Sequence, residues 1–129
     1  MRKTTNDSFL FSPELDNEAL QTLYENDFVY TSEVFTMFLK DTKNEFEQIK
    51  KSYKEHEIAT IRQKLHKIKP TFSFVGLGAL TIETESLICR CDTCSSIDEI
   101  AQECLALFEK IEQSFVLIER ELIRMKEYT

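Results

Sequence analysis

The sequence predicts an all-α fold, an antiparallel four-helix bundle with a short extra N-terminal helix. The chain has only 2 glycines and 2 prolines in 129 residues, too few for the frequent turns of a β-sandwich or barrel. Apolar residues recur at spacings of three and four along most of the chain, as on the buried side of a helix. Short connections join these stretches, which favours antiparallel neighbours. A chain of this length forms one domain with its own core.

The N-terminal region is predicted to contain a flexible arm over residues 1–12, and the bundle domain is expected over residues 13–129. The first helix is short and amphipathic, with Asp16 as its N-cap and an end near Asn26. We expect this helix to lie as a lid on the bundle. The side chains that anchor the arm are Phe9, Leu10 and Phe11.

A second, longer helix is predicted from Phe28 to Tyr53, with Asp27 as its N-cap. Its apolar residues alternate at spacings of four and three and form one stripe, while lysine and glutamate take the opposite side. The stripe consists of Phe35, Leu39, Thr42, Phe46, Ile49 and Tyr53.

A third helix with the same rhythm follows a break at residues 55–57, and Gly76 and Gly78 interrupt it. Glycine is typical just past a helix end, because it accepts positive φ without a Cβ clash. A fourth helix follows, and residues 92–95 are predicted to form a turn. The third stripe is Ile58, Ile61, Leu65, Ile68, Phe72 and Val75; the fourth is Leu77, Leu80, Thr84, Leu87 or Ile88, and Cys91.

The last helix shows the most regular pattern in the chain. Ser96 and Glu99 have the spacing of a capping box at its start. An intermolecular coiled coil and the inner face of a bundle both show such a pattern, but four stripes in one chain favour the bundle, and we expect a monomer. The stripe is Ile97, Ala101, Cys104, Phe108, Ile111, Phe115, Ile118, Leu122 and Met125.

Composition excludes several classes of function. The net charge of −7 and pI near 4.9 argue against nucleic acid as a partner, since like charges repel. No stretch of 18 apolar residues occurs, so no membrane span is predicted. Without a signal-peptide pattern, the four cysteines are interpreted as reduced thiols in a cytoplasmic protein. The start at Met1 and the self-contained core favour a stand-alone protein.

The third predicted helix carries a histidine on its solvated side. The centre of the stripe lies between Leu65 and Ile68, and helix geometry places His66 roughly 130° away from it. Cationic residues lie one turn before and one turn after the imidazole, and compact residues leave room around it. The residues that share this side are Ala59, Arg62, Gln63, Lys69, Pro70 and Ser73.

This arrangement has what a phosphoryl carrier requires. A neutral imidazole nitrogen is a nucleophile near pH 7. The moving phosphoryl group spreads negative charge over its oxygens, so a cation such as Lys69 would stabilise it. A lone surface histidine is also common as an ordinary polar residue, and spacing alone does not separate the two readings. His56, between Glu55 and Glu57, is interpreted as a solvated loop residue.

The stretch HKIKPTFSFVGLGAL resembles the signature of histidine-containing phosphotransfer (HPt) domains. That signature has His, an aliphatic residue at +2, Lys at +3, Gly at +4, an aliphatic–Gly pair at +9 and +10, and Leu at +14. The resemblance covers most of the chain, because the family fold is also a four-helix bundle with an extra N-terminal helix. The matching residues are His66, Ile68, Lys69, Val75, Gly76 and Leu80.

The resemblance implies a phosphorelay intermediate. His66 would accept a phosphoryl group from the aspartate of a receiver domain, in a response regulator or hybrid histidine kinase, and pass it to another receiver. Lys69 would be its charge partner. The chain would need no cofactor, since the receiver supplies Mg²⁺, and it would act as a modified carrier rather than an enzyme. Phe74 would contact the docked receiver, or alternatively be buried under the lid or a flanking helix.

One residue departs from the signature, because Pro70 stands where the family has glycine at +4. Proline in a helix removes the bond to the carbonyl four residues earlier and typically costs about 3 kcal/mol. We therefore expect a kink just after His66, with its carbonyl open to water. The substitution bears on the geometry of transfer more than on the fold.

Two other functions are compatible with the sequence. A degenerate bundle could dock on a kinase or receiver without accepting phosphate, and Pro70 favours this reading. The cysteine cluster could hold a structural zinc, although its spacing differs from the usual Cys-x2-Cys pairs and we expect no metal site. A complete histidine kinase is excluded, since the chain lacks a glycine-rich nucleotide loop. The cysteines are Cys89, Cys91, Cys94 and Cys104.

Overall fold

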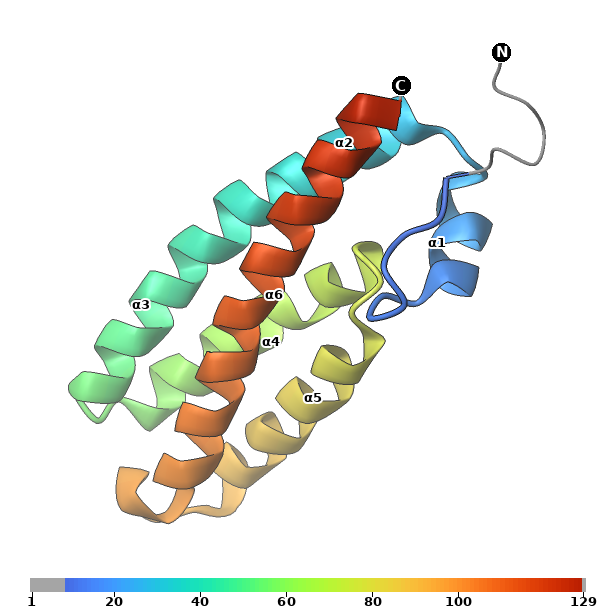
Figure 1. Cartoon of the computed structure of the whole chain (residues 1–129). Helices are drawn as coiled ribbons and strands as arrows, with labels where there is room; N and C mark the ends of the chain where they lie inside the picture. Colours follow the sequence, from blue (N-terminus) through green and yellow to red (C-terminus); the bar gives the residue numbers. More distant parts are fainter. Residues whose placement is uncertain (1–8, 129) are drawn as a thin grey trace.

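The computed structural model describes residues 9–128, and this part of the chain forms helices and short connections without a β-strand. The predicted fold class is confirmed: long helices pack as an antiparallel bundle, with a short extra helix at the N-terminal end (Figure 1). The elements are α1 (Asn17–Tyr24), α2 (Phe28–Met37), the π-helical turn η2 (Phe38–Thr42), α3 (Lys43–Lys54), α4 (Ile58–Phe74), α5 (Gly78–Thr93), the 3₁₀ turn η3 (Ile97–Ile100) and α6 (Ala101–Tyr128).

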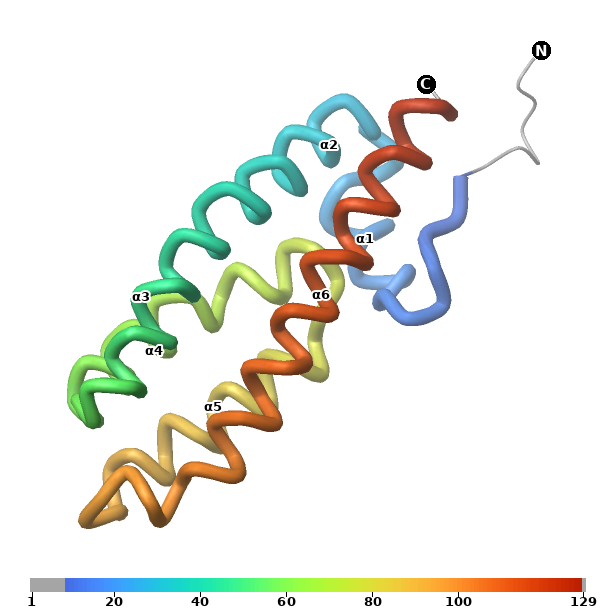
Figure 2. Tube along the Cα trace, turned by 60° about the vertical axis from the view of Figure 1, so that its left-hand side comes forward, coloured from blue at the N-terminus to red at the C-terminus, as the bar shows by residue number. Residues whose placement is uncertain are grey.

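The elements α2, η2 and α3 form one continuous rod, and α4, α5 and α6 follow in alternating directions (Figure 1 and Figure 2). Each rod packs against its neighbour in the sequence, and α6 closes the bundle against α2. The C-terminus of α6 therefore lies beside the start of α2 (Figure 2). α1 lies at this end of the bundle, where α4 passes into α5.

The predicted helix starts agree with the structure. The Asp16 carboxylate accepts a hydrogen bond from the backbone N–H of Ala19 at 3.0 Å, and Asp27 accepts one from that of Tyr30 at 3.1 Å. The capping box of Ser96 is also formed, although it opens η3, which leads directly into α6. Such side-chain acceptors satisfy N–H groups that have no partner within the helix.

Two predicted boundaries were wrong by one or two residues. α1 ends at Tyr24 rather than near Asn26, because the next residue takes a left-handed conformation. The turn predicted over residues 92–95 begins later, since α5 continues to Thr93 and Cys94 is its C-cap. Helix ends fray, and residue patterns fix them only to within a residue or two.

The stripe predicted for the second helix is interrupted at η2. Phe35, Thr42 and Phe46 are buried as expected. Leu39 is only partly buried, however, and its neighbour Phe38 takes the place in the core. Both residues lie in the π-helical turn, where Phe38 is the more deeply buried of the two and Leu39 packs against the edge of the core.

The connection between α4 and α5 needs glycine at one of its two glycine positions. Gly76 has φ +77°, and the N–H groups of Gly76 and Leu77 close the helix end by bonding the carbonyls of Ser73 and Phe72 at 3.2 and 2.8 Å. This is a Schellman motif, in which glycine takes the left-handed position. Gly78 starts α5, and a Cβ there would meet open space.

α6 buries a wider face than the predicted stripe. The nine stripe residues lie in the core or at its edge, as expected. A second row is buried beside them, because α6 packs against both α2 and α5. This row consists of Ile100 at the end of η3 and of Leu107, Ser114, Leu117 and Glu121 on α6.

The predicted N-terminal arm lies outside the described residues over positions 1–8. Phe11 belongs to the hydrophobic core, and Phe9 packs its ring edge-on against those of Phe11 and Phe28. The backbone N–H of Ser12 donates to Oε1 of the buried Glu121 at 2.7 Å. Residues 9–12 are therefore held against α6.

Candidate functional site

The exposed face of α4 is set by the four apolar residues that the helix buries. Ile61, Leu65, Ile68 and Phe72 are at most 2% exposed. A helix turns 100° per residue, so the positions between them point away from the core. His66 lies on this outer side and is exposed, as the sequence predicts.

His66 has no hydrogen-bond or ion-pair partner among the residues that the structure describes. The residue is exposed, so its imidazole is accessible to an incoming group. A nucleophilic nitrogen requires this access, because the attacking nitrogen and the leaving oxygen must lie in line on opposite sides of the phosphorus atom.

Both cations expected beside the imidazole point toward α5 and are paired there. Nζ of Lys69 lies 2.5 Å from Oε1 of Glu85, and Nε of Arg62 lies 2.6 Å from Oδ1 of Asp92. These contacts lie on one flank of the histidine and join α4 to α5. The sequence indicated that Lys69 and Arg62 share the face of His66, but it did not indicate their carboxylate partners.

Two more cations lie on the opposite flank and reach toward α3. Lys67 and Lys64 approach the two carboxylate oxygens of Glu45 at 2.8 and 3.4 Å, and Lys64 also donates to Oε1 of Gln48 at 2.7 Å. These contacts, led by the hydrogen bond from Lys67, lower the pKa of Glu45. His66 thus lies between two rows of paired cations and has no partner itself within residues 9–128.

Electrostatics link the imidazole to α5. The pKa of Glu85 is lowered, mainly by the hydrogen bond and charge of Lys69 and to a smaller extent by the charge of His66. The Sγ of Cys89 donates to the second oxygen of Glu85 at 3.6 Å, and this contact raises the pKa of the thiol. Glu85 is therefore an ionised neighbour of the histidine.

Pro70 lies on the exposed face of α4, one turn after His66. The helix continues through it from Ile58 to Phe74. Proline has no N–H to donate to the His66 carbonyl, so that oxygen lacks its usual helical partner. The bend predicted here stays a prediction.

The remaining predicted residues are spread over three environments. Gln63 is exposed on the His66 face, and the Ser73 hydroxyl lies 3.2 Å from that of Thr81 on α5. Gly76 is buried under α1, where its carbonyl accepts the backbone N–H of Asp16 at 2.9 Å. It shapes the helix end and is not part of the exposed face.

Phe74 lies at the rim of an apolar groove between α4 and α2, and its side chain is 49% exposed. The sequence left open whether Phe74 is buried under the lid helix, and the structure shows only partial burial. α1 does contact the backbone here, since the Tyr24 hydroxyl donates to the Phe74 carbonyl at 2.6 Å. The groove has a volume of about 310 Å³. Its walls are Tyr24, Tyr30, Val34, Met37, Phe38, Asp41, Thr42, Thr71 and Phe74.

Sequence reasoning missed the rest of this groove. Tyr30 and Met37 lie off the predicted stripe and are 53% and 61% exposed. Large apolar side chains on the polar side of an amphipathic helix were the available signal, since such residues gather where a partner binds. Their proximity to Phe74 depends on how α2 packs against α4.

Cys91, Cys94 and Cys104 lie near one another where α5 ends and α6 begins. Within residues 9–128, however, no three side chains of the metal-binding types are placed so that they could hold a metal ion. Cys91 and Cys104 are buried, and burial raises their pKa values to about 11 and about 12. A thiol in such an environment is protonated and inert. Cys89 is exposed and Cys94 partly buried.

The helices of the described residues include none that is long and apolar enough to cross a membrane. No protein-family model matches the chain, and no curated protein or solved structure shows a significant match to it.

Proposed function

We propose that this chain is a phosphorelay intermediate that carries a phosphoryl group on His66. The observation that carries the proposal is an exposed, unpartnered imidazole on α4 with cations one turn to either side. The resemblance of the surrounding sequence to HPt domains supports it, as does the bundle fold. The partners would be receiver domains of response regulators or hybrid histidine kinases in the cytoplasm.

The transfer step needs only groups that the two partners supply. The lone pair of one His66 ring nitrogen attacks the phosphorus of an aspartyl phosphate on the receiver. The N–P bond forms as the P–O bond breaks, and the electron pair of that bond remains on the aspartate carboxylate. The ring then carries a positive charge, which it loses by releasing the proton on its other nitrogen. Return to a second receiver reverses these events.

This step defines which groups each of the two proteins contributes. Mg²⁺ and the aspartate belong to the receiver, and this chain contributes the nucleophile and nearby positive charge, without a cofactor or turnover of its own. Lys69 would approach the phosphoryl oxygens, where charge develops. The apolar groove beside Phe74 would dock an apolar element of the receiver, because it is open and lies on the helix that carries His66.

Phosphotransfer from a panel of phosphorylated receiver domains tests the proposal. We expect acid-labile label on the wild type, none on His66→Gln, and unchanged label on the matched control His56→Gln, whose imidazole lies in the α3–α4 loop. Lys69→Ala should slow transfer roughly 10- to 100-fold, since it removes one charge that stabilises the transition state, with unchanged helical circular dichroism. Label that persists on His66→Gln would refute the proposal.

A second candidate function is a docking module that binds receivers without accepting phosphate. Two observations favour it: Pro70 replaces the signature glycine, and both cations flanking His66 already have carboxylate partners. Receiver binding without label on the wild type would select this function. The same binding assay with Phe74→Ala would then show whether the groove is the contact surface.

A further inference from the structure

The lysine expected to stabilise the phosphoryl group has another anionic partner. Its Nζ lies 2.5 Å from Oε1 of Glu85, across the α4–α5 interface. The second oxygen of Glu85 accepts from Cys89 Sγ at 3.6 Å, so both carboxylate oxygens are engaged. A phosphoryl group on His66 and the Glu85 carboxylate would therefore compete for one ammonium group.

Charge favours the phosphoryl group over Glu85 in the competition for Lys69. A phosphoryl group brings nearly two negative charges close to Glu85, and like charges at short range oppose each other. The Lys69 side chain is 27% exposed and the Glu85 side chain 48% exposed. Both are long and reach solvent, so the pair can open without disturbing the core.

We propose that Glu85 is a positioning residue that holds Lys69 away from His66 until a phosphoryl group arrives. When the pair opens, Lys69 can bind the phosphoryl oxygens, and the freed Glu85 carboxylate repels the phosphoryl group. Glu85 thereby disfavours phosphorylation of His66 and favours onward donation. This inference rests on the proposed function, because it concerns the same histidine.

The second ion pair between α4 and α5, Arg62 with Asp92, differs from the pair of Lys69 with Glu85. Asp92 is further along α5 and has a shorter side chain than Glu85. The hydrogen bond and charge of Lys69 and the charge of His66 lower the pKa of Glu85, whereas Asp92 is the main cause of the raised pKa of Arg62. Glu85 therefore pairs with Lys69 and lies close enough to His66 for their charges to interact.

The test uses the full chain and a small anionic phosphodonor, phosphoramidate, so that no receiver is required. The His66 nitrogen attacks phosphorus, the N–P bond of the donor breaks, and its nitrogen leaves as ammonia. The rate of His66 phosphorylation is followed by ³¹P NMR, with His56 as an internal measure of donor activity. Glu85→Gln should raise the His66 rate about three- to tenfold, because it removes the repulsion and weakens the hold on Lys69.

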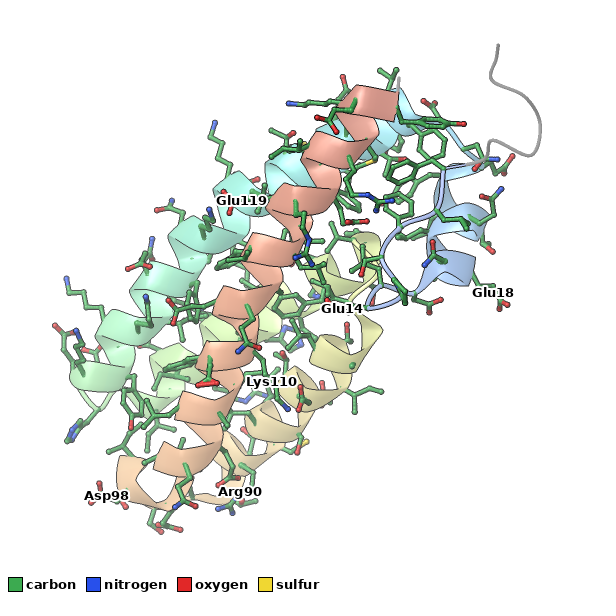
Figure 3. The ribbon with its side chains drawn as sticks, viewed as in Figure 1. Glu14, Glu18, Arg90, Asp98, Lys110 and Glu119 are labelled. Carbon is green, nitrogen blue, oxygen red and sulfur yellow. The ribbon has the colours of Figure 1, made fainter. Side chains whose placement is uncertain are left out.

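The chain offers a matched control on the same helix. Glu83 also forms an exposed ion pair, but its partner is Lys110 on α6. Lys110 is labelled in Figure 3. Glu83→Gln should leave the His66 rate unchanged, and Glu85→Asp, which keeps the charge, should stay close to the wild type. In a Lys69→Ala background, Glu85→Gln should raise the His66 rate much less, because Glu85 then has no lysine to hold. Substitutions of residues that act through each other are not additive.

The possible outcomes separate the two proposals. An unchanged or lower His66 rate in Glu85→Gln overturns the role of Glu85, even if receivers phosphorylate the wild type. No phosphorylation of His66 in either protein, with His56 labelled, also overturns it. A faster Glu85→Gln variant supports the positioning role even where every receiver fails to transfer, in which case only the relay proposal is lost.

Discussion

At the scale of single residues, the surroundings decide what a motif position does. Gly76 belongs to the stretch that resembles the HPt signature, yet it lies under α1 and its carbonyl bonds the Asp16 N–H. Its φ of +77° disfavours any residue with a Cβ, and a Cβ would lie 2.9 Å from Cδ1 of Leu20. Gly78 has no such constraint. The requirement for glycine at position 76 is therefore structural.

Substitution of the two glycines by alanine should have opposite effects. Gly76→Ala should lower the free energy of unfolding by about 1–3 kcal/mol, because the new side chain is strained at positive φ and crowds Leu20. Gly78→Ala lies in open space at the start of α5 and should be neutral or stabilising by up to about 1 kcal/mol. Urea denaturation of both variants measures the difference. Equal stability of the two variants would contradict this account.

At the scale of elements, α4 is tied to both neighbours by the charged rows beside His66. Arg62 and Lys69 pair with α5, whereas Lys64 and Lys67 share Glu45 on α3. The period of the helix predicted which residues share the exposed face, because that depends on α4 alone. It could not predict their partners, since these depend on how two other helices pack. The sequence therefore indicated the cations beside His66 but not the carboxylates that pair with them.

The pairing of Glu45 should appear as a pH dependence of stability. Its pKa in the folded protein is lowered from 4.5, so the interaction stabilises the fold above that pH and is lost as the pH falls through the lowered pKa. Glu45→Gln should lower stability by about 0.5–1 kcal/mol at pH 7, and the difference from the wild type should shrink as the pH falls below 4.5. Urea unfolding at several pH values measures it. A difference that persists or grows in acid would refute this prediction.

A control for this measurement lies on the same helix. Glu47 pairs with Lys50 within α3 at 3.0 Å, and its side chain is 70% exposed. Such a local, solvated pair contributes little, so Glu47→Gln should follow the wild-type pH profile.

At the scale of the whole molecule, the fold was largely predictable because each helix carries its own stripe. The predictions were wrong or incomplete where burial depends on several elements at once. In the π-helical turn Phe38 is buried more deeply than the predicted Leu39, and α6 buries a second row that includes Glu121. A charged residue in a regular polar position gives no sign that the N-terminal segment will cover it. The groove beside Phe74 escaped prediction for the same reason.

Glu121 connects the two ends of the chain. Only 1% of it is exposed, and its Oε1 accepts from the Ser12 N–H at 2.7 Å and from Arg124 at 2.6 Å. Arg124 in turn donates to the Leu10 carbonyl at 2.9 Å and lies over the ring of Phe9. One buried carboxylate thus holds residues 9–12 against α6.

Removal of this carboxylate should release the N-terminal segment and weaken the whole fold. Glu121→Ala should lower the free energy of unfolding by about 1–3 kcal/mol, because it leaves the part-buried Ser12 N–H and the Arg124 guanidinium without their acceptor. The matched control is Glu119→Ala, two residues earlier on the exposed side of α6 (Figure 3), whose pair with Lys43 is solvated and should contribute little. Urea denaturation gives the stability, and hydrogen exchange at residues 9–12 reports the release. If Glu121→Ala unfolds like the control, or if the N-terminal amides stay protected, the carboxylate is not what joins the two ends of the chain.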